Sequence, residues 1–159
     1  MSEKFRTKDG KDFLFAFFIH PDTIKAMRYL GIDHGSKRIG IAVSDSEGRI
    51  AFPKSTIINR GIRPTLMELR YLVKKEEIVH IVIGLPLSTD GTETEQTREV
   101  RKFAEALEDD ITLPIDFENE MLTSRLVERE GVAKDHVDES SAAIILQSYL
   151  DKANRFDKR

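Results

Sequence analysis

The order of strand-like and helix-like segments limits the possible folds more than any other feature of this sequence. Two short apolar segments, residues 29–33 and 39–43, are joined by only five residues, which is the length of a hairpin link. A third strand-like segment at 49–57 contains Pro53, which cannot donate a ladder hydrogen bond and so predicts a strand at the edge of a sheet. We therefore expect three consecutive strands.

Helices and strands alternate after this point. The remaining segments are predicted as two helix–strand pairs followed by two helices, at 64–75, 78–83, 93–108, 115–117, 124–130 and 139–154. This order indicates an α/β protein with a mixed five-stranded sheet and helices on both faces. Ligands of such sheets bind where strand ends meet, and Asp33 and Glu120 lie at the ends of the first and fifth strands.

Composition excludes several classes of function. The 159 residues suffice for one domain, and no segment is apolar over the roughly 20 residues that a membrane helix needs. The chain has no cysteine, which rules out disulfides, thiolate zinc sites and cysteine nucleophiles and predicts a reducing, cytoplasmic environment. Because the formal net charge is −3, any nucleic-acid contact must come from a local basic patch or from metal ions.

The first 26 residues are set apart from the rest of the chain. Their apolar run at 13–19 follows a segment that contains Glu3, Asp9 and Asp12, which is unlike a secretory signal. Met27 leads directly into the first strand, so we interpret it as a possible true start. We assign no function to residues 1–26 and expect a single domain over residues 27–159.

Three carboxylates are candidates for chemistry, and each has a structural alternative. Asp33 ends the first strand, where it could face a phosphate or a metal, or bond to backbone amides of the hairpin turn. Glu120 follows the fifth strand, where it could lie in a ligand-binding loop or belong to a solvated strand face with Asp116 and Glu118. Asp138 precedes the final helix, where it could bind a metal or cap the helix N-terminus.

These carboxylates acquire a function only if the fold brings them together. Hard oxygen ligands select Mg²⁺ or Mn²⁺, and two such ions about 4 Å apart can activate a water and stabilise the leaving oxygen of a phosphodiester. Without metal, clustered carboxylates would repel one another, and at least one would resist ionising. Lys37 and Arg38, just past Asp33, could bind a phosphate beside the ions or simply be exposed at the hairpin tip.

Three blocks in order along the chain resemble one known family. The blocks are MRYLGIDHGSKRIGIAVSD at 27–45, IVIGLPLSTDGTE at 81–93 with RKFA at 101–104, and VDESSAAIILQSYLD at 137–151. They resemble the YqgF/RuvX-type Holliday junction resolvases, which are also described as pre-16S rRNA nucleases. The resemblance implies an RNase H-like fold and metal-dependent cleavage of phosphodiester bonds.

The resemblance also implies roles for individual residues. Asp33 matches the family's first-strand aspartate, Asp138 its final-helix aspartate, and Glu120 the glutamate of its Asp-Glu-Arg-Leu-Thr/Ser motif. These three are the expected catalytic residues and ligands of two Mg²⁺ or Mn²⁺ ions, with Asp33 shared by both. Asn119 and Met121 replace the motif's flanking Asp and Arg. Residues 131–137 contain few cations, so the sequence predicts weaker binding of backbone phosphates.

The leading hypothesis is a nuclease that processes the 5′ end of precursor 16S rRNA. A Holliday junction resolvase that acts on branched DNA as a homodimer is an alternative. A non-catalytic nucleic-acid or ribosome-assembly protein of the same fold is a third hypothesis. A phosphotransferase of the actin type is a fourth, but such proteins need two lobes. The leading hypotheses share a nucleic-acid partner, no membrane association, and Lys37 and Arg38 as phosphate contacts.

Overall fold

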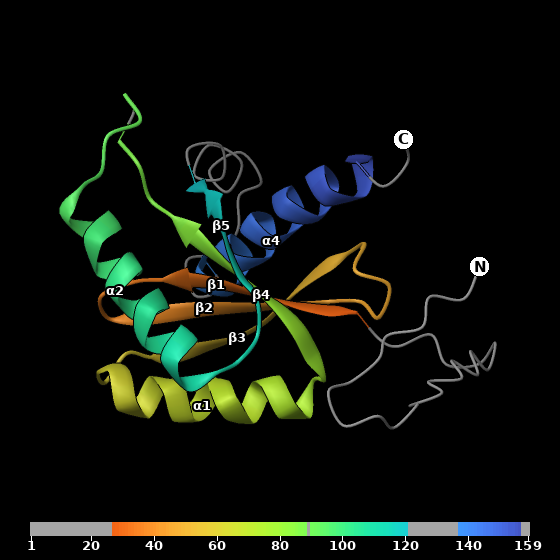
Figure 1. The fold of residues 1–159 in the computed structure, drawn as a ribbon, viewed down its shortest axis with the longest axis horizontal. Coiled ribbons are helices and arrows are strands. Elements are labelled where there is room, and N and C mark those ends of the chain that lie inside the picture. The colour runs from red at the N-terminus through yellow and green to blue at the C-terminus, as the bar shows by residue number, and fades with distance from the viewer. Residues whose placement is uncertain (1–26, 89, 121–136, 157–159) are drawn as a thin grey trace, which may run out of the picture.

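The computed structural model describes residues 27–88, 90–120 and 137–156, arranged as Figure 1 shows. Five strands form one sheet in the order β3–β2–β1–β4–β5. They are β1 (Arg28–His34), β2 (Arg38–Ser44), β3 (Ala51–Ile58), β4 (Ile78–Leu85) and β5 (Ile115–Asn119). The first three are antiparallel neighbours, whereas β4 runs parallel to β1 and β5 parallel to β4. The expected mixed five-stranded sheet is confirmed.

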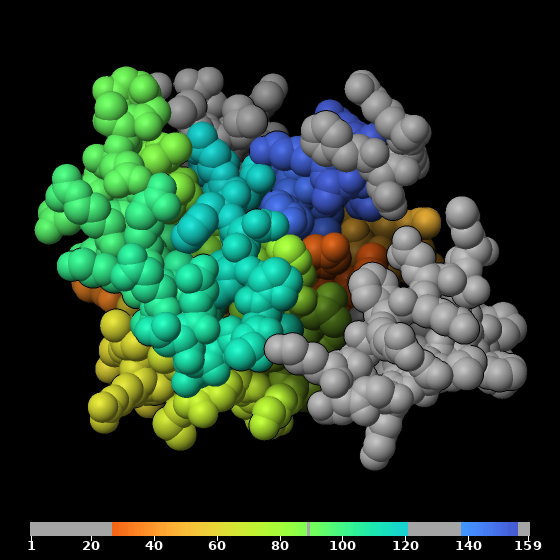
Figure 2. All heavy atoms as spheres, viewed as in Figure 1, coloured from red at the N-terminus to blue at the C-terminus, as the bar shows by residue number. Residues whose placement is uncertain are grey.

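Helices cover both faces of this sheet, as expected. Helices α1 (Ile62–Lys75) and α2 (Glu95–Asp110) pack on one face, and α4 (Val137–Phe156) packs on the other. Figure 2 shows α1 and α2 side by side along one side of the molecule, with α4 on another. Each face has its own apolar cluster, and β1 contributes Leu30 and Ile32 to the cluster under α1 and α2. Since side chains alternate along a strand, Gly31 and Asp33 belong to the α4 face.

The third strand begins later than its sequence pattern suggests. It starts at Ala51 rather than at position 49, because the Asp45 carboxylate accepts hydrogen bonds from the backbone amides of Arg49 (2.7 Å) and Ile50 (3.2 Å). These bonds hold the segment in a turn. The prediction from Pro53 is confirmed, since β3 is an edge strand whose register with β2 shifts beside this residue.

Helix boundaries differ from the predicted ones by about one turn at most. Helix α1 starts two residues before Pro64, which the first turn tolerates because amides there need no helical acceptor. Helix α2 starts after Thr94, whose side chain accepts a hydrogen bond from the Thr97 amide (3.2 Å) while the Thr97 hydroxyl accepts one from the Thr94 amide (2.9 Å). The helix expected at 124–130 lies outside the described residues. Within the described ranges, no helix is long and apolar enough to cross a membrane.

Candidate active site

The candidate carboxylates lie around three residues that are in register on the neighbouring strands β2, β1 and β4. Asp33 in β1 pairs with Gly40 in β2. On its other side it lies one residue beyond the Ile32–Ile83 pair, which places it beside Gly84 in β4. Residues in register on adjacent strands point to the same face, here the α4 face. Because both neighbours are glycines, groups from other elements can approach Asp33 from either side.

Each glycine is covered by the element that carries another carboxylate. A Cβ on Gly40 would overlap the backbone carbonyl of Asp138, so the first turn of α4 rests directly on β2. A Cβ on Gly84 would overlap Oε1 of Glu120, so the Glu120 side chain extends across β4. Asp33 therefore lies between Asp138 on the β2 side and Glu120 on the β4 side. The structure brings together the three carboxylates that the sequence singled out.

The ionisation of these groups reflects this proximity. Burial raises the pKa of Asp33 from its usual 3.8 to about 6, and the charge of Asp138 contributes. Burial also raises the pKa of Glu120 from 4.5 to about 7, with a contribution from Asp33. The folded chain thus binds protons here more tightly than the unfolded chain does. These groups therefore favour folding only below about pH 4, and that stabilisation is lost as the pH rises from about 4 to about 7.

Asp138 also has a cationic partner. The Nε atom of Arg38 lies 2.8 Å from its Oδ2, whereas Lys37 is exposed at the hairpin turn. The alternative in which Asp138 caps α4 is wrong, because the helix already includes Val137 and Asp138 belongs to its first turn. Among the described residues, no three His, Asp or Glu side chains are arranged so that they could hold a metal ion as they stand. Arg38 instead balances the charge of Asp138.

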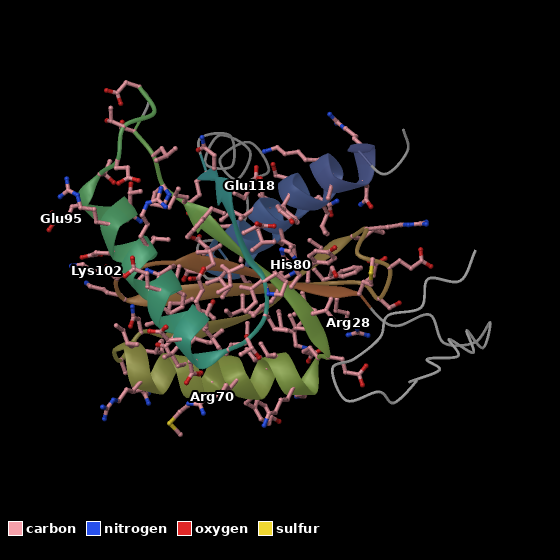
Figure 3. All side chains as sticks on the ribbon, viewed as in Figure 1. Arg28, Arg70, His80, Glu95, Lys102 and Glu118 are labelled. Atoms are coloured by element: carbon pink, nitrogen blue, oxygen red, sulfur yellow. The ribbon has the colours of Figure 1, made fainter. Side chains whose placement is uncertain are left out.

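The alternative of a solvated strand face at Glu120 is also wrong. Strand β5 continues to Asn119, and Glu118 within it is only 4% exposed. The Glu118 carboxylate accepts a hydrogen bond from Ser148 (2.9 Å) and pairs with Lys152, both on α4. Figure 3 labels Glu118 on β5. These contacts hold β5 against α4 two residues before Glu120. The sequence signal for them is the spacing of Ser148 and Lys152, four residues apart on one helix face.

Two histidines of the sheet have structural roles. The His34 ring stacks on Phe103 of α2, with ring centroids 4.5 Å apart, on the face opposite Asp33. His80, which we expected to be structural, lies in β4 with its Nε2 2.9 Å from Oδ2 of Asp116. The Tyr149 hydroxyl donates a hydrogen bond to the same oxygen (2.6 Å). This second cluster ties β4, β5 and α4 together.

Comparisons with known proteins agree with this architecture. Residues 27–152 match the family described as "RuvX: Holliday junction resolvase". A protein of Nitratidesulfovibrio vulgaris named "Putative pre-16S rRNA nuclease" is 41% identical over 133 residues, which cover 79% of this chain and 94% of the relative. A protein of Maridesulfovibrio salexigens with the same name is 40% identical over 136 residues, which cover 80% of this chain and all of the relative.

Solved structures show the same fold. Thermus thermophilus RuvC in complex with a Holliday junction substrate aligns with a TM-score of 0.56 at 11% identity, over 80% of this chain and 96% of RuvC. A second T. thermophilus RuvC structure aligns with a TM-score of 0.53 at 12% identity. At such identities the likeness establishes the fold alone, which is RNase H-like. Together with the family match, it defines a hydrolytic nuclease of RNase H-like fold. The chain belongs to the RuvX family.

Proposed function

We propose that this nuclease uses Mg²⁺ or Mn²⁺ to hydrolyse phosphodiester bonds near the 5′ end of precursor 16S rRNA, in the cytoplasm. The observation that carries the proposal is the convergence of Asp33, Glu120 and Asp138 from three elements, with raised pKa values at the first two. Acids whose pKa rises through burial and mutual repulsion gain most from a cation. Their hard oxygen donors suit Mg²⁺ or Mn²⁺. Relatives about 40% identical that bear the pre-16S name support the RNA substrate.

Each carboxylate has a distinct place in this mechanism. Asp33, between the other two, would be shared by two ions, with Glu120 and Asp138 as the outer ligands. Two bound ions would supply activation of the attacking water and stabilisation of the leaving oxygen. Arg38 makes the charge of Asp138 tolerable while no cation is bound. With a cation bound beside Asp138, the Arg38 guanidinium would be available to donate hydrogen bonds to a phosphate oxygen.

Cleavage of branched DNA is the second candidate function. The family match is described as a Holliday junction resolvase, and the fold matches that of RuvC. A resolvase that cuts two strands of a two-fold symmetric junction would work as a homodimer with one site in each subunit. Solution measurement of the oligomeric state with and without a junction therefore bears on this candidate, whereas an rRNA nuclease can act as a monomer.

A cleavage assay with both substrates tests the proposal. The purified chain is offered a precursor 16S rRNA fragment and a four-way DNA junction, each with Mn²⁺, with Mg²⁺ and with EDTA. We expect metal-dependent cleavage of the RNA. Asp33→Asn should lower the rate by about a thousandfold or more, because residues that act as one catalytic unit fail together. The variant keeps the size and shape of the side chain, so its far-UV spectrum should match that of the wild type.

Three outcomes would revise the proposal. Undiminished cleavage by cleanly purified Asp33→Asn would remove these carboxylates from the active site. Cleavage of the junction alone would favour the resolvase. Metal-independent binding of RNA without cleavage would support the third hypothesis, a nucleic-acid-binding protein that has kept the nuclease fold.

A further inference from the structure

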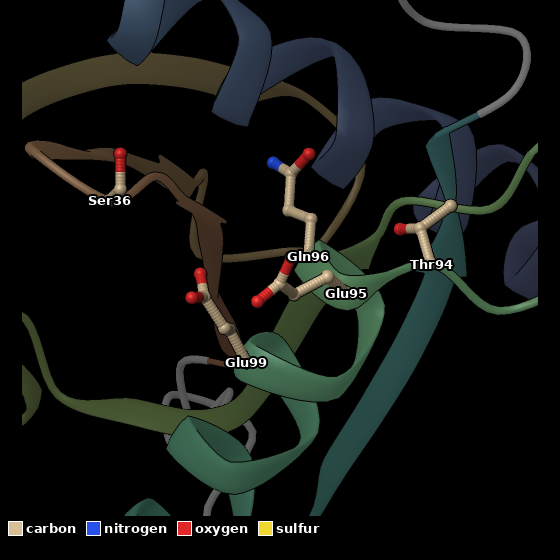
Figure 4. Close-up of a pocket in the computed structure, with 5 residues that line it drawn as sticks. All are labelled: Ser36, Thr94, Glu95, Gln96 and Glu99. Carbon is tan, nitrogen blue, oxygen red and sulfur yellow. The ribbon is translucent and has the colours of Figure 1, made fainter.

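The surroundings of the carboxylates differ in charge from one side to the other. Between the β1–β2 turn and the start of α2 lies a hollow of about 540 Å³. Figure 4 shows Glu95, Gln96 and Glu99 of α2 lining it, with Ser36 of the turn opposite. Two carboxylates outweigh the partial positive charge, about half a unit, at a helix N-terminus. The lining of this hollow therefore carries net negative charge, which disfavours phosphate groups there.

The opposite side is basic and is built on a fixed backbone. The link between β3 and α1 is tied to the β1–β2 turn through Asn59, whose side chain donates a hydrogen bond to the carbonyl of Gly35 (3.0 Å). The Asn59 amide donates a second to the carbonyl of Lys37 (2.9 Å). These bonds place Arg60 next to Lys37. Arg38 follows Lys37, and its Nε lies 2.8 Å from Oδ2 of Asp138. The three cations therefore form a row that starts beside the candidate active site at Arg38 and continues through Lys37 to Arg60.

Two of these cations are not paired with a carboxylate among the described residues. Lys37 and Arg60 are exposed and have no ion-pair partner among the described residues. Elsewhere on the same sheet edge the exposed Lys54 is paired with Glu76 (2.8 Å), and Arg49 with Glu47 (3.1 Å). An exposed cation without a partner retains its full attraction for a polyanion, whereas a paired one must first give up its carboxylate.

We propose that Lys37, Arg38 and Arg60 form a basic wall that binds the phosphate backbone of the substrate on the β3 side of the active site. The proposal rests on the function proposed above and adds the path of the substrate. The polynucleotide lies over the β1–β2 turn and the β3–α1 link, with one phosphate at the carboxylates and its neighbours on the wall. It avoids the acidic start of α2. Backbone phosphates are the matching ligands, because cations contact them whatever the base sequence.

Neutralising one cation at a time tests the wall. Lys37→Gln and Arg60→Gln are made in the Asp33→Asn background, so that binding is measured without cleavage. Fluorescence anisotropy follows the precursor rRNA fragment and the four-way junction over a series of salt concentrations. Arg63→Gln is the matched control. Arg63 is also exposed and near Arg60, but it lines a separate hollow between α1 and α2 with Asp109 and Asp110.

Each wall variant should weaken binding about eightfold at 0.1 M salt and reduce the log–log salt slope by about one. A single phosphate contact contributes a slope of about 0.9, which amounts to that factor over the decade from 0.1 to 1 M. Arg63→Gln should change the affinity by less than about twofold, and thermal melting should show that all variants are folded.

The outcomes separate this inference from the proposed function. Equal affinities for Arg60→Gln, Lys37→Gln and Arg63→Gln would overturn the wall and leave the nuclease function standing if the wild type still cleaves. Failure of the wild-type chain to bind either polynucleotide would overturn both. Weakening with the RNA alone, or with the junction alone, supports the wall and identifies its ligand.

Discussion

Gly84 makes possible the approach of Glu120 to Asp33, and Gly84→Ala should therefore damage the candidate active site. The new Cβ would lie 2.4 Å from Oε1 of Glu120 and 2.6 Å from Cδ1 of Ile145 in α4. Ordinary van der Waals contact begins at 3.4 Å, so the Glu120 oxygen would have to move by about 1 Å (3.4 − 2.4). The substitution adds a single methyl group and leaves every proposed ligand in place.

The expected effects follow from this displacement. Misplacing a catalytic group by about 1 Å can lower the rate about a hundredfold. Disturbing the support of a metal ligand weakens metal binding by about ten- to a hundredfold. Overpacking against Ile145 should lower the free energy of unfolding by about 1–3 kcal/mol. Loss of metal affinity and loss of stability thus have separate origins, namely Glu120 and Ile145.

A second variant separates these two effects. Ile145→Val removes the Cδ1 atom that meets the new methyl group, so Gly84→Ala/Ile145→Val should recover much of the stability lost in Gly84→Ala. The overlap with Glu120 is unchanged, so metal affinity and cleavage should stay low. Titration calorimetry with Mn²⁺ and urea unfolding without metal measure the two quantities. The reasoning is refuted if Gly84→Ala binds Mn²⁺ as the wild type does, or if Ile145→Val restores metal binding.

Three further predictions concern stability. Asp33→Asn should stabilise the metal-free chain at pH 7.5 by up to about 3 kcal/mol but not at pH 4, because it removes a carboxylate whose pKa is raised to about 6. Mg²⁺ should raise the wild-type Tm more at pH 7.5 than at pH 5. A stability difference between Asp33→Asn and wild type that does not change with pH in urea unfolding would contradict the first prediction. A rise in Tm with Mg²⁺ that does not change with pH would contradict the second. Tyr149→Phe should cost about 1 kcal/mol at pH 7, and less as the pH falls below 4, since the hydroxyl lowers the pKa of Asp116. An unchanged urea midpoint at pH 7 would count against it.

Much of the fold could be predicted because its signals are local. The strand and helix periods of the side chains establish the order of elements, and Pro53 correctly indicates an edge strand. The boundaries were less certain, since capping and turn bonds decide them. Asp45 delays β3 through two hydrogen bonds, and Thr94 and Thr97 together fix the start of α2. Such bonds move an element by a residue or two without changing which elements form.

The candidate site is less accessible to local reasoning. Asp33, Glu120 and Asp138 each fitted an ordinary structural role. The order of elements placed Asp33 and Glu120 near the same end of one sheet, and only the family resemblance added Asp138. Their roles as ligands and catalytic residues remain predictions, as do the phosphate contacts of Lys37 and Arg38. The sequence does contain the glycines that let these groups come close, since Gly40 on β2 and Gly84 on β4 lie on either side of Asp33. A glycine in a strand signals a close neighbour but does not say which one.

The sequence by itself determined the α/β class, the five strands, the edge position of β3 and the placement of Asp33 at the end of β1. These follow from periodicity and turn chemistry, which act over a few residues. Only the tertiary structure decided that α4 rests on Gly40, that Glu118 is buried beneath α4, and that Glu120 crosses Gly84 toward Asp33. Those facts depend on the order β3–β2–β1–β4–β5, which places β1 beside a strand more than forty residues later in the chain. Side-chain periodicity carries no record of such distant pairing, so the candidate active site forms only when the sheet is assembled.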